Sequence, residues 1–142
     1  MASNPARSPK DKTGGMMYFP RMLDKIRLQA RGELAADYQA NLSAQPSADG
    51  MCCHLLRVGH KALTARVLAG GTDEEILKWC YTTGRRLDEA DLMVWNGFLS
   101  KLGWNDFATP FLEQTKQQSG LSDRVDIVTI PDLIDFDENR NR

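Results

Sequence analysis

The segment from Asp88 to Leu102 constrains the fold most, because it is apolar on two sides and yet carries Asn96-Gly97 in its interior. Together these two residues cost the interior of a helix roughly 1–2 kcal/mol relative to Ala. The segment still has the period of a helix, with Asp88 as its N-cap and Gly103 as its stop signal. One apolar face carries Leu92, Trp95, Phe98, Leu99 and Leu102, and a second face, roughly opposite, carries Ala90, Met93, Val94 and Gly97. Two apolar faces are typical of a central helix, so we expect Gly97 to admit a neighbouring backbone.

Caps and stop signals predict the other helices. Pro20 suits the first turn of a helix that ends before Gly32, and Thr72 with Glu75 forms a capping box. The last predicted helix begins at Thr109 or one turn earlier. The five predicted helices cover residues 20–31, 60–69, 73–83, 88–102 and 109–119. We therefore expect a mainly α fold, a compact helical bundle of about five helices.

The remaining stretches are harder to assign. Asp37–Leu42 is a candidate turn of helix, and Met51–Val58 is either a strand or a buried helical turn, because so short an apolar run shows no clear period. Val125–Ile130 is the only convincing β-like stretch and predicts a short extended C-terminal segment. A single helical turn is predicted to follow over Pro131–Phe136.

The domain organisation follows from length and composition. The chain has 142 residues, which suits one domain with a single core. Residues 1–15 are rich in Pro, Ser, Lys and Gly and are predicted to be a disordered lead-in. Residues 16–138 are predicted to form a single α-helical domain, and residues 139–142 a frayed tail.

Charge is balanced overall but differs between the two ends. The formal net charge of −1 gives no sign of a nucleic-acid or membrane partner, and we expect neither. Residues 1–31 hold seven Lys and Arg against two Asp, whereas residues 120–142 hold six acidic residues against three Arg. We expect the acidic tail to dock near the basic first helix, within one chain or between two; independently solvated ends are the alternative.

The chain has three cysteines, Cys52, Cys53 and Cys80, which limit the redox and metal chemistry open to it. The first two are adjacent, so their side chains diverge and do not make the usual spacing of a zinc site with His54 or His60. Buried, inert thiols fit their apolar neighbours better, and no flanking pattern marks a catalytic thiolate. No metal ligand, cofactor or catalytic residue is predicted. The N-terminus lacks an apolar leader, so a reducing cytoplasm is expected.

The candidate contact residues are arginines and the residues next to the unfavourable Asn96-Gly97 pair inside the predicted helix. Arginines on the first helix offer an anion site or simply a solvated face, and Arg86 follows the helix end at Gly84, where the helix dipole favours a cation. Trp95 and Asn96 flank the break in the helix pattern, and such breaks concentrate at functional sites. Ligand or partner contacts are therefore predicted for Arg21, Arg27, Arg31, Arg86, Trp95 and Asn96.

Three blocks in order, Pro20–Arg27, Gly70–Ile76 and Trp95–Phe98, resemble an uncharacterised bacterial family, number 5069 in the domain-of-unknown-function series. The resemblance covers nearly the whole chain. It implies a short, standalone, cytoplasmic protein, and it implies no activity, cofactor or site residue.

Two hypotheses about function remain open. The first is a small soluble α-helical protein that acts through protein association, as a homodimer or with another partner, suggested by the opposite charges of its ends, by Leu28 on a charged helix face and by the two-sided helix. The alternative is a small-molecule binder or enzyme with a pocket around Trp95, Asn96 and nearby arginines. The sequence identifies neither a reaction nor a partner.

Overall fold

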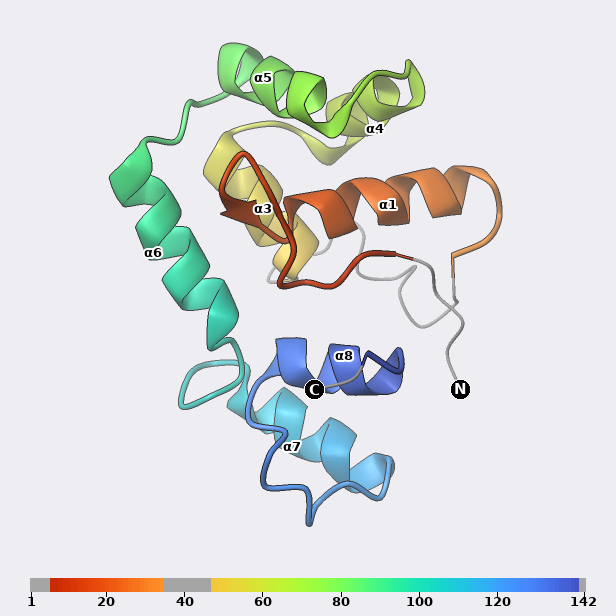
Figure 1. Cartoon of the computed structure of the whole chain (residues 1–142), viewed down its shortest axis with the longest axis vertical. Coiled ribbons are helices and arrows are strands. Elements are labelled where there is room, and N and C mark those ends of the chain that lie inside the picture. Colours follow the sequence, from red (N-terminus) through yellow and green to blue (C-terminus); the bar gives the residue numbers. More distant parts are fainter. Residues whose placement is uncertain (1–5, 35–46, 141–142) are drawn as a thin grey trace.

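The computed structural model describes residues 6–34 and 47–140 of the chain. Within these residues the fold is mainly α, as predicted, with seven helices rather than about five (Figure 1). The elements are β1 (Lys12–Thr13), β2 (Met16–Met17), α1 (Phe19–Ala30), α3 (Ala48–Leu56), α4 (His60–Leu68), α5 (Asp73–Thr83), α6 (Glu89–Ser100), α7 (Thr109–Gln118) and α8 (Ile130–Asp137). The two additional helices are α3 and α8, because the run from Met51 is helical and the turn predicted after Pro131 is a complete helix. The predicted turn at Asp37–Leu42 lies outside the described residues.

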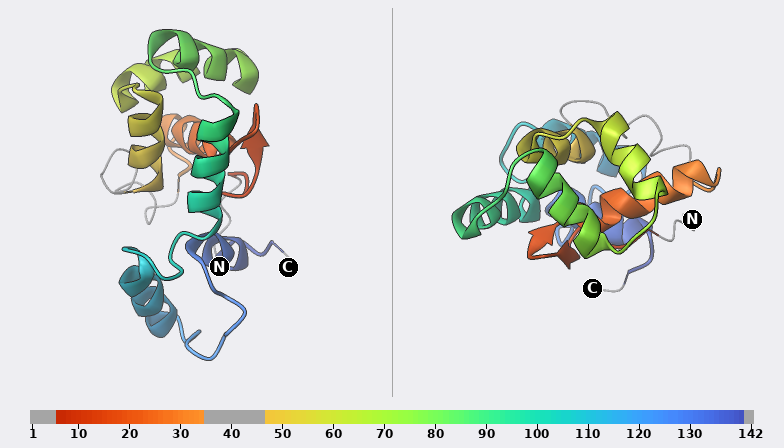
Figure 2. Two further views of the ribbon diagram at one scale, coloured as in Figure 1. Left: turned by 90° about the vertical axis from the view of Figure 1, so that its left-hand side faces the viewer. Right: turned by 90° about the horizontal axis from the view of Figure 1, so that it is seen from above.

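Helix α1 crosses the middle of the molecule, with α4 and α5 on one side, α7 and α8 on the other, and α3 beside its first turns (Figure 1). Helix α6 runs along one side and connects the two parts, which the rotated views also show (Figure 2). The main core lies around α1 and includes Phe19, Met22, Leu23, Leu56, Leu63 and Ile76, all fully buried. A smaller cluster of Leu112, Ile127 and Leu133 joins α7 to α8.

Helix starts follow the capping chemistry read from the sequence. The Thr72 hydroxyl accepts a hydrogen bond from the Glu75 backbone N–H at 3.1 Å, and the Glu75 carboxylate accepts one from the Thr72 N–H at 2.8 Å. Asp88 and Asp91 form the same reciprocal pair at the start of α6. Each pair satisfies two backbone donors that a helix leaves without partners, so these two boundaries are fixed locally.

A two-residue turn joins β1 to β2 within the stretch assigned to a lead-in. Gly14 and Gly15 have φ of +55° and +82°, which suits the tight turn of a two-residue hairpin. Lys12 pairs with Met17 and Thr13 with Met16 in antiparallel register. Residues 6–15 pack against the domain, and Ala6 is fully buried with Leu28 and Leu34. Leu28 is therefore not a surface residue, and its place on a charged helix face no longer supports association.

No strand forms at the predicted β-like stretch Val125–Ile130, which begins in a turn, continues as irregular backbone and ends at the first residue of α8. The Lys116 ammonium reaches into this segment and donates hydrogen bonds to the carbonyl oxygens of Arg124 and Ile127, each at 2.9 Å. These carbonyl groups are thus satisfied by a side chain rather than by a neighbouring strand. The predicted extended C-terminal segment is a loop that α7 holds in place.

Helix α6 is not central, which corrects the expectation drawn from its two apolar faces. Trp95 and Leu99 are buried, but Met93 and Val94 on the opposite side are 72% and 73% exposed. A Cβ atom placed on Gly97 would meet nothing within 4 Å, so this glycine admits no neighbouring backbone among the described residues. With this side facing the viewer, no other described helix covers α6 (Figure 2, left).

Candidate functional site

Trp95 and Asn96 attach α6 to the β1–β2 hairpin. The Trp95 indole N–H donates to the Met17 carbonyl at 2.9 Å. The Asn96 side chain accepts from the Met17 N–H at 3.0 Å and donates to the Gly15 carbonyl at 2.8 Å. These bonds satisfy hairpin groups that would otherwise lack partners at the edge of a two-stranded sheet. Both side chains predicted to contact a ligand are thus placed against the chain's own backbone.

The four predicted arginines do not converge on one place. Arg21 is buried and holds Glu138 of the C-terminal tail through two hydrogen bonds of 2.9 and 2.7 Å. Arg27 bridges Asp24 and Asp73, and Arg31 pairs with Glu33 at the surface. Arg86 is exposed, near the start of α6.

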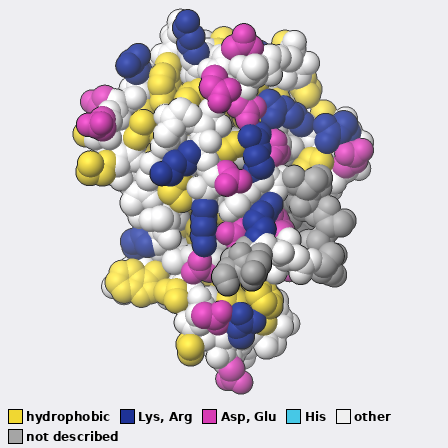
Figure 3. All heavy atoms as spheres, viewed as in Figure 1, with side chains coloured by type: hydrophobic (Ala, Val, Ile, Leu, Met, Phe, Trp, Pro, Cys, Tyr) yellow, Lys and Arg dark blue, Asp and Glu magenta, His cyan; other side chains and the backbone are white. Residues whose placement is uncertain are grey.

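The acidic tail docks against the basic N-terminal part within one chain, which confirms that prediction. Besides the Arg21–Glu138 pair, Lys10 lies 2.8 Å from Asp132 and 3.6 Å from Asp135. Arg140 pairs with Asp135 and Glu138 of its own helix end. Lys, Arg and acidic side chains alternate over this face of the molecule (Figure 3). The opposite charges of the two ends are therefore used inside the monomer and give no separate support to association.

These ion pairs predict a loss of stability in acid. Burial opposes ionisation of Asp24, but hydrogen bonds from Arg7 outweigh it and hold the Asp24 pKa below its ordinary value of 3.8. Lys10 has the same effect on the pKa of Asp132. A carboxylate with a lowered folded-state pKa contributes stability above its unfolded pKa, and this contribution is lost as the pH falls through the folded pKa. We therefore expect the melting temperature to decrease once the pH is lowered past about 4. In the Arg7→Ala variant, the melting temperature should decrease less steeply over the same pH series. An unchanged pH profile would show that the Arg7–Asp24 pair is not a source of the acid sensitivity.

A buried polar cluster missed by the sequence analysis joins α1 to α3. The Tyr18 hydroxyl donates to Asp49 at 2.6 Å, and the Lys25 ammonium lies 2.9 Å from the second Asp49 oxygen and 3.2 Å from the Tyr18 hydroxyl. All three residues are at least 96% buried. Arg21, Lys25 and the buried Leu28 are three to four residues apart on one helix face. An apolar residue on the same helix face as two cations was the signal that this face is covered.

Burial dominates the titration behaviour of the cluster. It raises the pKa of Tyr18 well above its ordinary value, and the neighbouring Asp49 carboxylate adds to this effect. It lowers the pKa of Lys25, against the attraction of the same carboxylate. A neutral tyrosine and a charge-paired lysine enclosed in the core hold two helices together. The pocket described below contains none of these three residues.

The cysteines are buried free thiols, in agreement with the core positions expected of them. Burial raises the pKa of Cys53 and of Cys80 to about 12, so neither is a ready nucleophile at neutral pH. His60 has its pKa lowered by burial, while His54 is exposed. Within residues 6–34 and 47–140, no three His, Cys, Asp or Glu side chains lie close enough to hold a metal ion.

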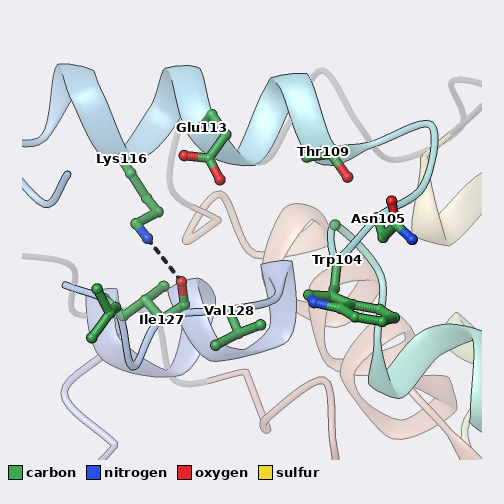
Figure 4. Close-up of a pocket in the computed structure, with 9 residues that line it drawn as sticks. Trp104, Asn105, Thr109, Glu113, Lys116, Ile127 and Val128 are labelled. Carbon is green, nitrogen blue, oxygen red and sulfur yellow. Dashed lines mark hydrogen bonds between the residues drawn. The ribbon is translucent and has the colours of Figure 1, made fainter. Parts of the chain in front are cut away.

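One open pocket of about 260 Å³ lies between α7 and the segment before α8 (Figure 4). Trp104 forms one wall, Val128 lies below, and Glu113 projects from α7. The Lys116 ammonium at its inner end is engaged by loop carbonyls. This pocket is lined by the second Trp-Asn pair of the sequence, Trp104-Asn105, and not by Trp95-Asn96.

The outer face of α6, defined as Ala90, Met93, Val94 and Gly97, is the most distinctive surface of the described chain. All four residues are exposed. Phe98, one turn after Val94, stacks on Phe107 with ring centroids 6.5 Å apart, and Phe107 is 55% exposed. Apolar side chains gather along this edge of the molecule and over the loop that follows α6 (Figure 3). Large exposed apolar patches on a protein mark interaction sites.

Fold and surface together define a small, mainly α-helical protein with a polar cluster in its core and an apolar helix face at its surface. The chain belongs to the family described as "Domain of unknown function (DUF5069)", whose model matches residues 3–140. This confirms the resemblance carried by the three sequence blocks, and the family description states no function. No curated protein matches the chain significantly. No described helix is long and apolar enough to cross a membrane.

Proposed function

We propose that this protein acts by associating with another protein chain through the outer face of α6. The observation that carries the proposal is the exposure of Met93 and Val94, at 72% and 73%, side by side on a well-formed helix. Burying one such side chain contributes about 1.5–3 kcal/mol, so covering both supplies a useful share of a binding free energy. The exposed Phe107 ring continues the surface beyond the helix.

The geometry favours association over the small-molecule alternative. Trp95 and Asn96, which suggested a ligand pocket, have hydrogen-bond partners in the hairpin, and Arg21 has one in Glu138. The exposed side of α6 has no equivalent partner among the described residues. Interaction surfaces of this kind have an apolar centre with charged residues at the rim, and Glu89 and Lys101 stand at the two ends of α6.

Val94→Glu is the variant that tests this proposal. A carboxylate at the centre of the face would be buried without a partner in a complex, so we expect the complex to be lost while the fold is kept, because Val94 makes few contacts in the monomer. Native mass spectrometry of the full chain, purified from its own host without a metal-binding tag, should show a species heavier than 15.9 kDa. The variant should show the 15.9 kDa chain alone.

Leu68→Glu is the matched control, since Leu68 is also an exposed apolar residue, at 54%, but lies at the end of α4. It should retain the heavier species. A wild-type protein that remains a bare monomer, or a Val94→Glu variant that assembles as the wild type does, would overturn the proposal. We also propose a cytoplasmic location, supported by three free cysteines, which a reducing compartment preserves.

A further inference from the structure

We propose that the partner is a second copy of this chain, whose α6 packs antiparallel against the first through the same outer face. This inference rests on the proposed function and names its partner. Interfaces between identical chains are commonly isologous, so the surface must complement itself when turned by a twofold rotation. The charges and the shape of α6 meet this condition.

The charges at the two ends of α6 are self-complementary. Glu89 is the first residue of the helix and is exposed, and Lys101 is its C-cap. Lys101 follows Glu89 by twelve residues, which is about 18 Å along the helix axis. An antiparallel arrangement brings each Glu89 to the Lys101 of the other copy, whereas a parallel arrangement brings like charges together. Among the described residues Lys101 donates to Asp106 alone, which leaves ammonium donors for a second carboxylate.

The shape of the face fits the same register. The midpoint between Glu89 and Lys101 is residue 95, so Met93 of one copy lies opposite Gly97 of the other, with Val94 one residue further along the helix. Gly97 has open space where a Cβ would stand, and it therefore provides a notch for these two side chains. A small residue where two helices cross lets their axes approach closely, to the lower end of the usual interaxial distance of about 8–10 Å. The dimer then explains why a glycine stands inside this helix, whereas no contact of Gly97 with residues 6–34 or 47–140 of its own chain explains it.

The size of the face sets the expected strength. One side of a helix about 18 Å long is smaller than the roughly 800 Å² per partner of a standard interface. Arg86 and Trp104 lie beyond opposite ends of α6, and the antiparallel arrangement brings these ends of the two copies together, which enlarges the contact. We expect a reversible dimer whose population depends on concentration.

Single cysteines test the register directly. Val94 is one residue from the midpoint and Ala90 is five, so copies of these residues are offset along the axis by about 3 Å and about 15 Å. Disulfides need Cα atoms within about 7 Å. Under mild oxidation Val94→Cys should form a covalent dimer, and Ala90→Cys should not. The natural thiols do not interfere, because Cys52, Cys53 and Cys80 are buried. If both variants form covalent dimers, the helices are parallel. If neither variant forms one, this face is not used. Either result overturns the inference.

A charge exchange supplies the matched control. Glu89→Lys should weaken the dimer at least about threefold, and Glu89→Lys with Lys101→Glu should restore it, provided that the melting temperatures stay comparable. A double variant as weak as the single one contradicts the register. The mass of the complex separates this inference from the proposed function. Suppose that Val94→Glu abolishes a complex whose mass is not twice 15.9 kDa. Association through the outer face of α6 would then stand, but a second copy would be refuted as the partner.

Discussion

Replacing Asp49 with Asn is expected to lower the free energy of unfolding by about 3–5 kcal/mol, because it removes the carboxylate that lies against the buried Lys25 ammonium. The Asp49 side chain is 0% exposed to water, and its carboxylate lies 2.9 Å from the Lys25 ammonium. A loss of this size is a large fraction of the roughly 5–15 kcal/mol that stabilises an ordinary domain. Chemical denaturation of wild type and variant measures it.

The double variant Lys25→Met/Asp49→Leu is the informative control. Removing both charges together removes the desolvation cost as well as the attraction, so the loss should be much smaller than for Asp49→Asn. The Tyr18 hydroxyl loses Asp49 as its acceptor in this variant, which sets a remaining cost of about 1–3 kcal/mol. A double variant as unstable as Asp49→Asn would show that the ion pair is not the source of the effect.

Gly84→Ala is expected to destabilise the protein by about 3 kcal/mol or more, because the added methyl group has no space. Its Cβ would stand 2.1 Å from the Leu56 carbonyl oxygen and 2.7 Å from that of Arg57. These are backbone atoms at the end of α3, and they cannot turn aside as the end of a flexible side chain can. The neighbouring Arg85 N–H donates to the same Leu56 carbonyl at 2.8 Å, so a shift of the chain would also break this bond.

Gly97→Ala provides a control of opposite sign. Nothing lies within 4 Å of its added Cβ, and Ala is preferred to Gly inside a helix by roughly 0.5–1 kcal/mol. Thermal unfolding at high dilution should therefore show Gly97→Ala above the wild type and Gly84→Ala far below it. Equal effects of the two substitutions would contradict the close approach between the ends of α3 and α5.

Helix boundaries were predictable where local chemistry sets them. The reciprocal caps at Thr72 and Asp88 involve residues three apart, so the sequence alone carries the complete signal. Helix α3 was ambiguous for the opposite reason, because a short run from Met51 that packs on the core shows no clear period. Val125–Ile130 was wrongly predicted to be β-like: it forms no strand, and Lys116, eleven residues before Ile127, donates to the Ile127 carbonyl.

Contacts between residues far apart in the chain could not be predicted from the sequence. Asn96 broke a helix rule and suggested a site, but it bonds Gly15, which lies 81 residues away. Likewise Tyr18 and Asp49 are 31 residues apart, and no spacing rule connects them. Both faces of α6 carry apolar residues in the sequence, whereas only the structure shows that the hairpin and the core cover one face and leave Met93 and Val94 exposed.

The measurement that most directly tests the central claim is the molar mass of the full chain by light scattering over a wide range of concentration, for the wild type and for Val94→Glu. Dimerisation through the outer face of α6 predicts that the wild-type mass rises from 15.9 kDa towards twice that value, while the variant stays at 15.9 kDa throughout. A wild-type mass that never exceeds 15.9 kDa, or a variant whose mass rises in parallel with the wild type, would contradict it.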